Sequence, residues 1–311
     1  MRDIALVLPE KLDETAVLKL IGQLSGRHPL GIWLCSRSQQ LSDSQLKVMA
    51  GLEAIGAAVS AHLSVTPETL KAMSASLVLI AWTTSQAPAA EWRTFIRDLS
   101  RRMPAPVWIM NGHAAAPSTV TALIDSDGAD RIDPHLAADV LRVSFTLARA
   151  LDVPLDIINV WYFLEEGLLR SWRLRTPEPE INEKKRRAAW IAQSDLARLL
   201  AALSPVLSWR RLDCLQGPVT SCMRGRVSED TLIVTGSSGR DGWVARFRPS
   251  LAEDLCRQRQ APIVIVKKLD AKALALLNGT TLQDRSDTDT SRFDSSENHR
   301  KKGARFLTNG P

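Results

Sequence analysis

Short apolar runs alternate with longer amphipathic stretches through the first third of the chain. The short runs, rich in Val, Ile and Leu, predict strands at Asp3–Leu8, Leu30–Cys35, Ala57–Leu63, Ser76–Trp82 and Pro106–Met110. The longer stretches repeat apolar residues at helical spacing and predict helices at Asp13–Leu24, Ser42–Ile55 and Ala90–Arg102, with a short helix after Thr66. Because parallel strands need crossover connections, this alternation predicts a parallel sheet with helices on both faces.

The same order of elements begins again after a linker of small residues at His113–Thr119. The second series of strands is predicted at Val120–Ile124, Leu155–Trp161, Leu207–Leu212, Leu232–Thr235 and Pro262–Val266. The helices between them are predicted at Pro134–Leu151, Ile181–Leu203 and, as a stub, Val219–Arg224. Repetition at the length of one domain indicates duplication. The sequence therefore predicts an α/β protein with two tandem, doubly wound, parallel five-stranded sheets, in domains 1–112 and 119–268.

A glycine turn follows the fourth strand of the second half. Gly236 and Gly239 come directly after the apolar run, and the absence of a Cβ lets a ligand approach their backbone. Ser250 then stands where a helix N-cap belongs. A strand, a glycine turn and a helix N-terminus form an anion-binding site, because free N–H groups and the helix dipole point to one place.

This stretch resembles the C-terminal signature of the universal stress protein family. Its nucleotide-binding members carry Gly-x2-Gly-x9-Gly-Ser/Thr; Gly236 and Gly239 match the first two glycines, Ser250 matches the hydroxyl position, and Pro249 replaces the third glycine. The resemblance implies a non-catalytic regulatory protein of the stress response that binds ATP or AMP in its second domain. No metal site is evident in the sequence.

The resemblance also indicates where the base and ribose of a nucleotide would lie. In the family, an acid at the end of the first strand lies near them, and Asp125 holds that position here. A backbone contact from the second strand falls at Val160. A local alternative for Asp125 is an Asx-turn that closes the strand, with Gly128 nearby.

Proline at position 249 changes the expected phosphate contacts. Proline has no N–H to donate to a phosphate oxygen, and its φ angle is fixed. Arg240, Arg246 and Arg248 lie in the loop before it, and their guanidinium groups are predicted to bind phosphate oxygens in its place.

The first half lacks these features, because its first strand ends at Pro9 and Trp82–Ser85 contains no glycine pair. We therefore predict that it is a structural or dimerising copy without a ligand. Each half is expected to have strand order 3-2-1-4-5, which places the fifth strand at an edge. Met103–Met110 and Pro262–Val266 are then candidate edges for pairing between the halves as a pseudo-dimer, or in a homo-oligomer.

Composition sets further limits on the protein. The chain has 311 residues, of which 45% are hydrophobic and 24% charged, and no apolar run is long enough to span a bilayer. The apolar run at Ile4–Leu8 is too short for a signal peptide. Four scattered cysteines favour free thiols in a reducing cytoplasm. Residues 279–311 are polar and predicted to be disordered.

Signals for catalysis are absent from the sequence. The five histidines have no metal-ligand spacing, and the glycine turn is neither a P-loop nor a nucleophile elbow. The basic run Lys184–Arg187 is offset by Glu178, Glu180 and Glu183, which favours a solvated helix face over a nucleic-acid site. Two alternatives stay open: a nucleotide-free interaction scaffold of the same fold, with an unknown protein partner, and an enzyme of a related α/β nucleotide-binding group.

Overall fold

The computed structural model describes most of the chain up to position 278. The described residues are 3–10, 12–25, 30–82, 90–111, 116–125, 133–163, 165–171, 174, 176–203, 207–237 and 262–278. The side chains of residues 82, 90–93, 100, 111 and 125 lie outside this description.

Strands and helices alternate in both halves of the chain. The first half contains β1 (Asp3–Val7), α1 (Glu14–Ser25), β2 (Gly31–Cys35), α2 (Asp43–Ala54), β3 (Ala58–His62), α3 (Pro67–Ala72), β4 (Leu77–Trp82), α4 (Ala90–Arg102) and β5 (Val107–Asn111). The second contains β6 (Thr119–Asp125), α5 (Pro134–Leu151), β7 (Leu155–Trp161), α6 (Glu166–Leu169), α7 (Glu178–Leu203), β8 (Arg211–Gln216), α8 (Val219–Met223), β9 (Thr231–Gly236), β10 (Ile263–Val266) and α11 (Ala271–Asn278). The predicted tail at 279–311 lies outside the described residues.

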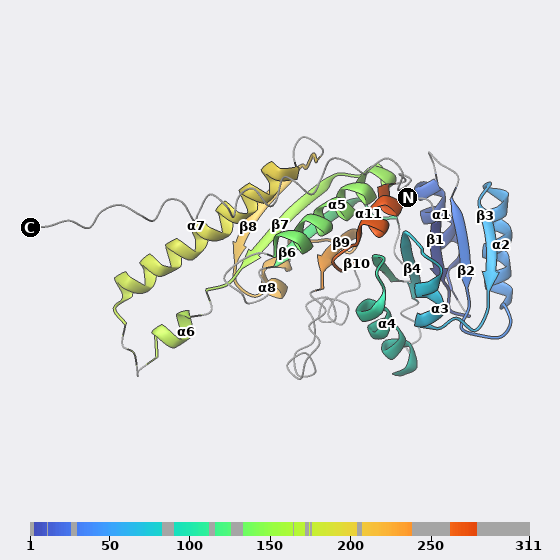
Figure 1. The fold of residues 1–311 in the computed structure, drawn as a ribbon, viewed down its shortest axis with the longest axis horizontal. Coiled ribbons are helices and arrows are strands. Elements are labelled where there is room, and N and C mark those ends of the chain that lie inside the picture. Colours follow the sequence, from blue (N-terminus) through green and yellow to red (C-terminus); the bar gives the residue numbers. More distant parts are fainter. Residues whose placement is uncertain are drawn as a thin grey trace, which may run out of the picture.

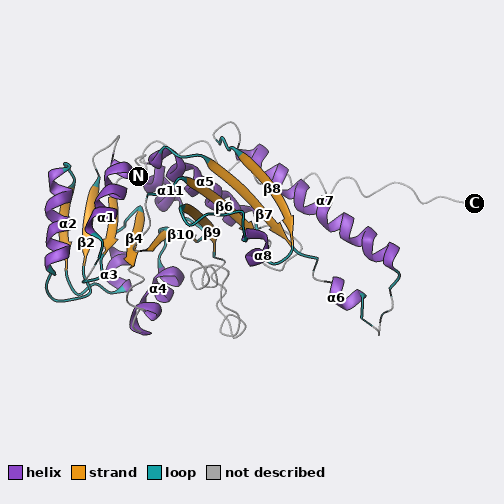
Figure 2. Cartoon of the chain, turned by 180° about the vertical axis from the view of Figure 1, so that it is seen from behind, coloured by secondary structure: helices purple, strands orange, loops and turns teal. Residues whose placement is uncertain are grey.

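The strands form one continuous sheet of ten strands rather than two sheets of five. Their order is β3-β2-β1-β4-β5-β10-β9-β6-β7-β8, so each half has the predicted internal order. Figures 1 and 2 show the strands as a single row from β2 to β8. The prediction of two separate sheets was wrong because the fifth strands pair with each other.

The junction between the halves is an antiparallel pair of the two fifth strands. Trp108 in β5 lies opposite Val264 in β10, and Ile109 lies opposite Ile263. β10 also pairs in parallel with β9, so its four apolar residues are buried with a strand on each side. The prediction that these two edges are available for pairing is confirmed: pairing satisfies their N–H and C=O groups and removes two apolar edges from solvent.

Helices cover both faces of the sheet. Side chains of α1, α2, α5, α7 and α11 share one buried cluster with one set of strand residues. Side chains of α3, α4 and α8 share a second cluster with residues of the opposite strand face. The doubly wound arrangement predicted from the alternating pattern is therefore present, within a mixed sheet.

The third strand of the second half begins four residues later than predicted. β8 runs from Arg211 to Gln216 instead of from Leu207 to Leu212. Leu207 is 8% exposed and packs in the core, whereas β8 takes its position from its register with Asp156–Trp161 of β7. The apolar pattern alone did not carry this information, because an edge strand that is largely exposed has no strict alternation.

A buried carboxylate connects α5 to the segment after β10. Asp139 is 5% exposed, accepts a hydrogen bond from the Leu269 N–H at 2.9 Å and forms an ion pair with Arg142 at 3.3 Å. Burial raises the pKa of Asp139 above its ordinary value of 3.8, although both contacts oppose this shift.

Asp139→Asn is expected to remove one source of pH dependence from folding. Because the pKa is raised in the folded state, native Asp139 binds more protons than the unfolded chain, and its contribution to stability falls as pH rises above about 3.8. The difference in unfolding free energy, variant minus wild type, should therefore increase as pH rises above about 3.8. Denaturant titrations at several pH values measure it. A constant or decreasing difference contradicts the assignment.

Trp108→Ala is expected to destabilise the junction strongly. Trp108 is fully buried, and removing a buried tryptophan side chain costs about 3–5 kcal/mol. Trp190→Ala is the matched control, because Trp190 is 67% exposed and its loss should change stability by no more than about 0.5 kcal/mol. The unfolding midpoint in denaturant, followed by far-ultraviolet circular dichroism, measures both. Equal effects would show that the junction is not a critical part of the core.

Candidate functional site

The carboxyl ends of β9, β6, β7 and β8 form one edge of the second half. The chain passes from β6 to β7 and β8 in one direction and then returns to β9 on the other side of β6. A reversal of this kind is a topological switch point, and ligands of doubly wound folds bind in the crevice outside the strand ends there. Asp125 pairs with Val160 across β6 and β7, and Gly236 ends the adjacent β9.

The structure thus brings three of the predicted site residues to neighbouring strand ends. Val160 is fully buried, so its side chain is not available to a ligand. For Asp125 the structure places the backbone only. The other predicted residues lie outside the described part of the chain: Gly239, Arg240, Arg246, Arg248 and Ser250.

Gly236 has a packing role of its own. A Cβ at this position would lie 2.8 Å from Cγ and 2.9 Å from Cδ2 of Leu136, which is closer than real carbon atoms approach. Leu136 lies in the first turn of α5, so the glycine allows this helix to approach the end of β9. The Ser237 N–H donates to the Val266 carbonyl at 2.7 Å and ties the end of β9 to β10.

The N-terminus of α5 is already occupied by a carboxylate. Asp133 accepts hydrogen bonds from the N–H groups of His135 and Leu136 and forms an ion pair with Lys268 at 3.0 Å. Burial would raise the pKa of Asp133, but the hydrogen bonds from Lys268 and Leu136 lower it. A further anion is therefore disfavoured at this helix end.

The corresponding edge of the first half is filled by its own side chain. The buried Gln45 amide donates to the carbonyl of Leu8 at 2.9 Å and to the carbonyl of Pro9 at 3.3 Å. Gln45 also completes a capping box with Ser42 at the start of α2. These contacts occupy the backbone acceptors at the end of β1.

A second feature of this edge of the sheet is α7, whose N-terminal part extends beyond the strand ends and is called the overhang. This helix has 26 residues and β7 has 7, which correspond to lengths of about 39 Å and 23 Å. Its C-terminal part packs on the sheet through Leu196, Leu199 and Leu200. Its N-terminal part extends beyond the strand ends, where Figure 1 shows it beside α6.

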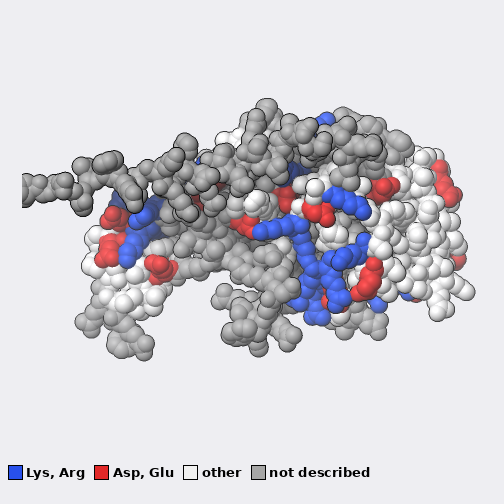
Figure 3. Space-filling view, in the orientation of Figure 1, with Lys and Arg blue, Asp and Glu red and all other residues white. Residues whose placement is uncertain are grey.

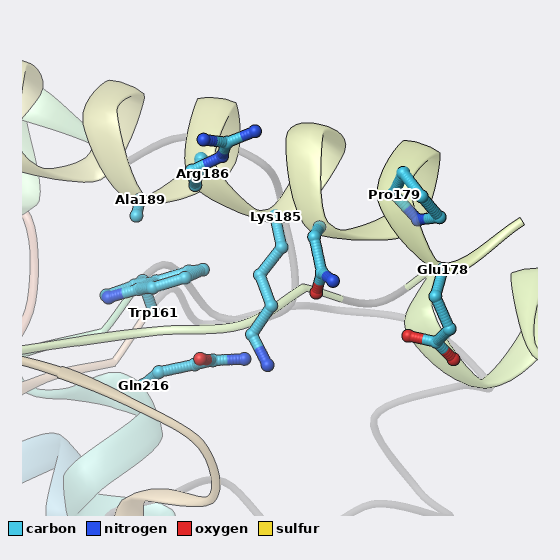
Figure 4. Close-up of a pocket in the computed structure, with 8 residues that line it drawn as sticks. Trp161, Glu178, Pro179, Lys185, Arg186, Ala189 and Gln216 are labelled. Atoms are coloured by element: carbon cyan, nitrogen blue, oxygen red, sulfur yellow. The ribbon is translucent and has the colours of Figure 1, made fainter.

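A groove of about 740 Å³ lies between this overhang and the strand ends, and is called the α7 groove. Its lining residues are Trp161, Glu178, Pro179, Asn182, Lys185, Arg186, Ala189 and Gln216. Trp161 and Gln216, the last residues of β7 and β8, are register partners. In Figure 4 the Trp161 indole lies below Ala189, and the Gln216 side chain runs below the indole toward the amine of Lys185.

The polar groups of the α7 groove retain capacity for a ligand. Within the described part of the chain, the side-chain amides of Gln216 and Asn182 have no hydrogen-bond partner. Lys185 Nζ lies 3.4 Å from Glu166 Oε1, and a third of the side chain is exposed. The sequence analysis did not identify this groove. One signal pointed to it: the helix predicted at Ile181–Leu203 is much longer than the strand predicted at Leu155–Trp161.

Several of the other charges on α7 are paired. Lys184 pairs with Glu180 at 3.0 Å, and Arg170 in the preceding segment pairs with Glu178. Figure 3 shows basic and acidic side chains interspersed at the free end of α7, while a larger group of Lys and Arg lies where Figure 1 has α4. This interspersion is the pattern of a solvated helix face, as predicted.

No reactive thiol or metal centre is found within the described residues. Burial raises the pKa of Cys35 to about 12, and burial also raises the pKa values of Cys214 and Cys222, so all three thiols stay protonated near neutral pH. The described residues hold no His, Cys, Asp and Glu group able to bind a metal ion. None of the described helices has the length and apolar character required to cross a bilayer.

Solved structures of low sequence identity share this fold. A protein of unknown function from Pseudomonas aeruginosa PAO1 superposes with a TM-score of 0.60 at 16% identity, over 89% of this chain and 96% of its own. A candidate universal stress protein from Pseudomonas aeruginosa UCBPP-PA14 gives 0.61 at 15% identity, over 89% and 96%. A universal stress protein from Archaeoglobus fulgidus DSM 4304 gives 0.52 at 12% identity, over 86% and 97%. These similarities establish the fold.

Comparisons of sequence add no closer assignment. No family model matches the chain. No curated protein matches it either.

Gly236→Ala is expected to destabilise the protein by about 1–3 kcal/mol, because the added Cβ overpacks against Leu136. The φ angle of Gly236 lies outside the left-handed region, so the cost comes from this contact and not from backbone strain. Leu136→Ala in the same chain should restore most of the loss. A double-mutant cycle of unfolding free energies measures the coupling, and strictly additive effects would contradict the proposed contact.

Proposed function

We propose that this chain is a non-catalytic regulatory protein of the universal stress type that binds an adenine nucleotide, ATP or AMP, in its second half. The observation that carries the proposal is the meeting of Asp125, Val160 and Gly236 at neighbouring strand ends beside a switch point. The shared fold of two universal stress proteins supports the same reading. The cysteines that the structure describes, Cys35, Cys214 and Cys222, form no disulfide, which suits a reducing compartment such as the cytoplasm.

Each part of the nucleotide has a proposed place along this edge. The ribose lies near Asp125, because a carboxylate at a strand end accepts hydrogen bonds from ribose hydroxyls. The base lies on the side of Val160, whose backbone supplies hydrogen bonds. The phosphates lie over the turn that begins at Gly236, with Arg240 and its neighbouring arginines as cationic partners.

One observation favours a second candidate function. Pro249 replaces the third glycine of the nucleotide signature and has no N–H for a phosphate. A nucleotide-free scaffold of the same fold, acting through a protein partner, is therefore the alternative that the experiment must separate.

Gly239→Val should weaken ATP binding at least about tenfold, because a β-branched side chain blocks the approach of phosphate to the turn. Asp125→Ala should weaken it through loss of the ribose contact, while Gly22→Val, in open space on α1, serves as the glycine control. Calorimetric titration with ATP and AMP measures affinity. Ligand-dependent heat stability provides a second readout, because binding to the native state raises its stability.

The control must bind like the wild type, and circular dichroism must show that each variant is folded. If folded wild type binds neither nucleotide at millimolar concentration, the scaffold function replaces the proposal.

A further inference from the structure

The two outer strands of the described sheet, β3 and β8, differ in how their edges are protected. An edge strand has unpaired N–H and C=O groups that can pair with another chain, and proteins usually guard it with charged side chains or proline. At β8, Arg210 and Arg211 are exposed and Asp213 is partly exposed. Residues 56–65, which contain β3, include no Asp, Glu, Lys, Arg or Pro. The β3 edge is therefore the unguarded one.

The backbone of β3 directs alternate residues toward this open edge. The Ala58 N–H and the His62 carbonyl form hydrogen bonds with the backbone that continues β2 at each end, at 3.2 Å and 2.8 Å. Because successive residues of a strand point their backbone groups to opposite sides, Ser60 also faces β2, whereas Val59 and Ala61 face outward. Ser60 and Ala61 are exposed. The edge thus presents two N–H and two C=O groups placed symmetrically about Ser60.

We propose that β3 pairs antiparallel with β3 of a second copy of this chain. A two-fold axis through Ser60, the middle residue of β3, gives the register in which all five residues overlap. Val59 of one copy then lies opposite Ala61 of the other, and each such pair exchanges two hydrogen bonds. A two-fold interface needs a patch that is complementary to itself, and the backbone pattern of this edge meets that condition.

The side chains along β3 are compatible with close approach of the two copies. Alanine and serine occupy three of its five positions, and no charged side chain is brought against its own copy. Leu63, just after the strand, is 46% exposed. The proposed register places it opposite Ala57 of the second copy, which removes apolar surface from solvent.

Helix α2 adds an apolar flank beside the edge. A Cβ added at Gly51 would lie 2.7 Å from Leu18 Cδ1, so this side of α2 packs against α1. Leu46 projects about 140° around the helix from Gly51 and therefore lies on the side away from α1. It is 44% exposed. Figure 1 shows α2 and β3 together at the right-hand end of the molecule, where a second copy has access to both.

A second copy fits this edge better than a charged partner does, because the edge has no charge with which to recognise one. The chain already joins β5 to β10 by antiparallel edge pairing, and the proposed contact continues the same sheet into another molecule. A standard interface buries about 800 Å² on each partner, and a five-residue strand with one helix flank is smaller. We therefore expect a weak dimer, with a dissociation constant on the order of 10 µM. The contact lies in the first half and does not depend on nucleotide binding.

Analytical ultracentrifugation of the full chain, from about 1 to about 200 µM, tests the pairing. Ser60→Lys places two like charges across the axis at an exposed position. Ala61→Pro removes an outward N–H and leaves the ladder with β2 intact. Leu212→Lys is the control on the β8 edge, where Leu212 is 42% exposed. Circular dichroism verifies that each variant is folded.

The wild type should associate into a dimer of two 34.3-kDa chains. Ser60→Lys should weaken dimerisation about threefold to fivefold, the scale of one cross-strand pair. Ala61→Pro should weaken it about tenfold or more, because two hydrogen bonds are lost. Leu212→Lys should behave like the wild type. A mixture of Ser60→Lys with Ser60→Glu should form a heterodimer more tightly than either variant associates with itself, because opposite charges then face each other.

Several results would overturn the pairing. One is a wild type that stays monomeric over the whole concentration range, and another is a dimer that is unchanged in both β3 variants. Loss of the dimer in Leu212→Lys but not in Ser60→Lys would assign the interface to β8 instead. Assemblies larger than a dimer that both lysine variants block would indicate head-to-tail pairing of β3 with β8, which contradicts the two-fold contact.

Discussion

The pairing of β5 with β10 is the contact on which the rest of the architecture depends. β10 has only four residues, and all four are buried because β5 and β9 flank it. Without this pair, each half would expose an apolar edge with unpaired backbone groups. The pair instead joins ten strands in one sheet and places Trp108 at the centre of the common core, where it is fully buried.

The direction of this pairing also separates the edges formed by the strand carboxyl ends of the two halves. Strands within each half are parallel, but β5 and β10 are antiparallel, so the first half runs opposite to the second. The carboxyl ends of the strands in the first half therefore lie next to the amino ends of the strands in the second half, at the opposite edge of the sheet from the carboxyl ends of the second half. A ligand at the end of β6 and β9 does not approach the end of β1, and the two edges are free to diverge in structure.

That divergence is visible in what occupies each edge. In the first half, Gln45 binds the backbone acceptors at the end of β1 and uses the capping box of α2 to hold its position. In the second half, Gly236 admits the first turn of α5, and α7 extends past the strand ends to form a groove with Trp161 and Gln216. The first half therefore fills this edge with the Gln45 side chain, whereas the second half has the α7 groove beside it.

The sequence by itself determined the local and repetitive features. Apolar runs and helical spacing predicted nearly all the described elements, since these patterns reflect which faces each element buries. The strand order predicted for each half also identified the two edges that pair. Only the tertiary structure decided that the pair is antiparallel and makes one sheet, because edge pairing is a contact between distant segments that periodicity does not encode.

The same applies to β8, whose start depends on its register with β7. It applies also to the α7 groove, which exists because a helix and a strand of unequal length are packed together. The contact of Gly236 with Leu136 likewise joins residues a hundred positions apart, so a glycine that suggested a ligand turn in the sequence has a packing role in the fold.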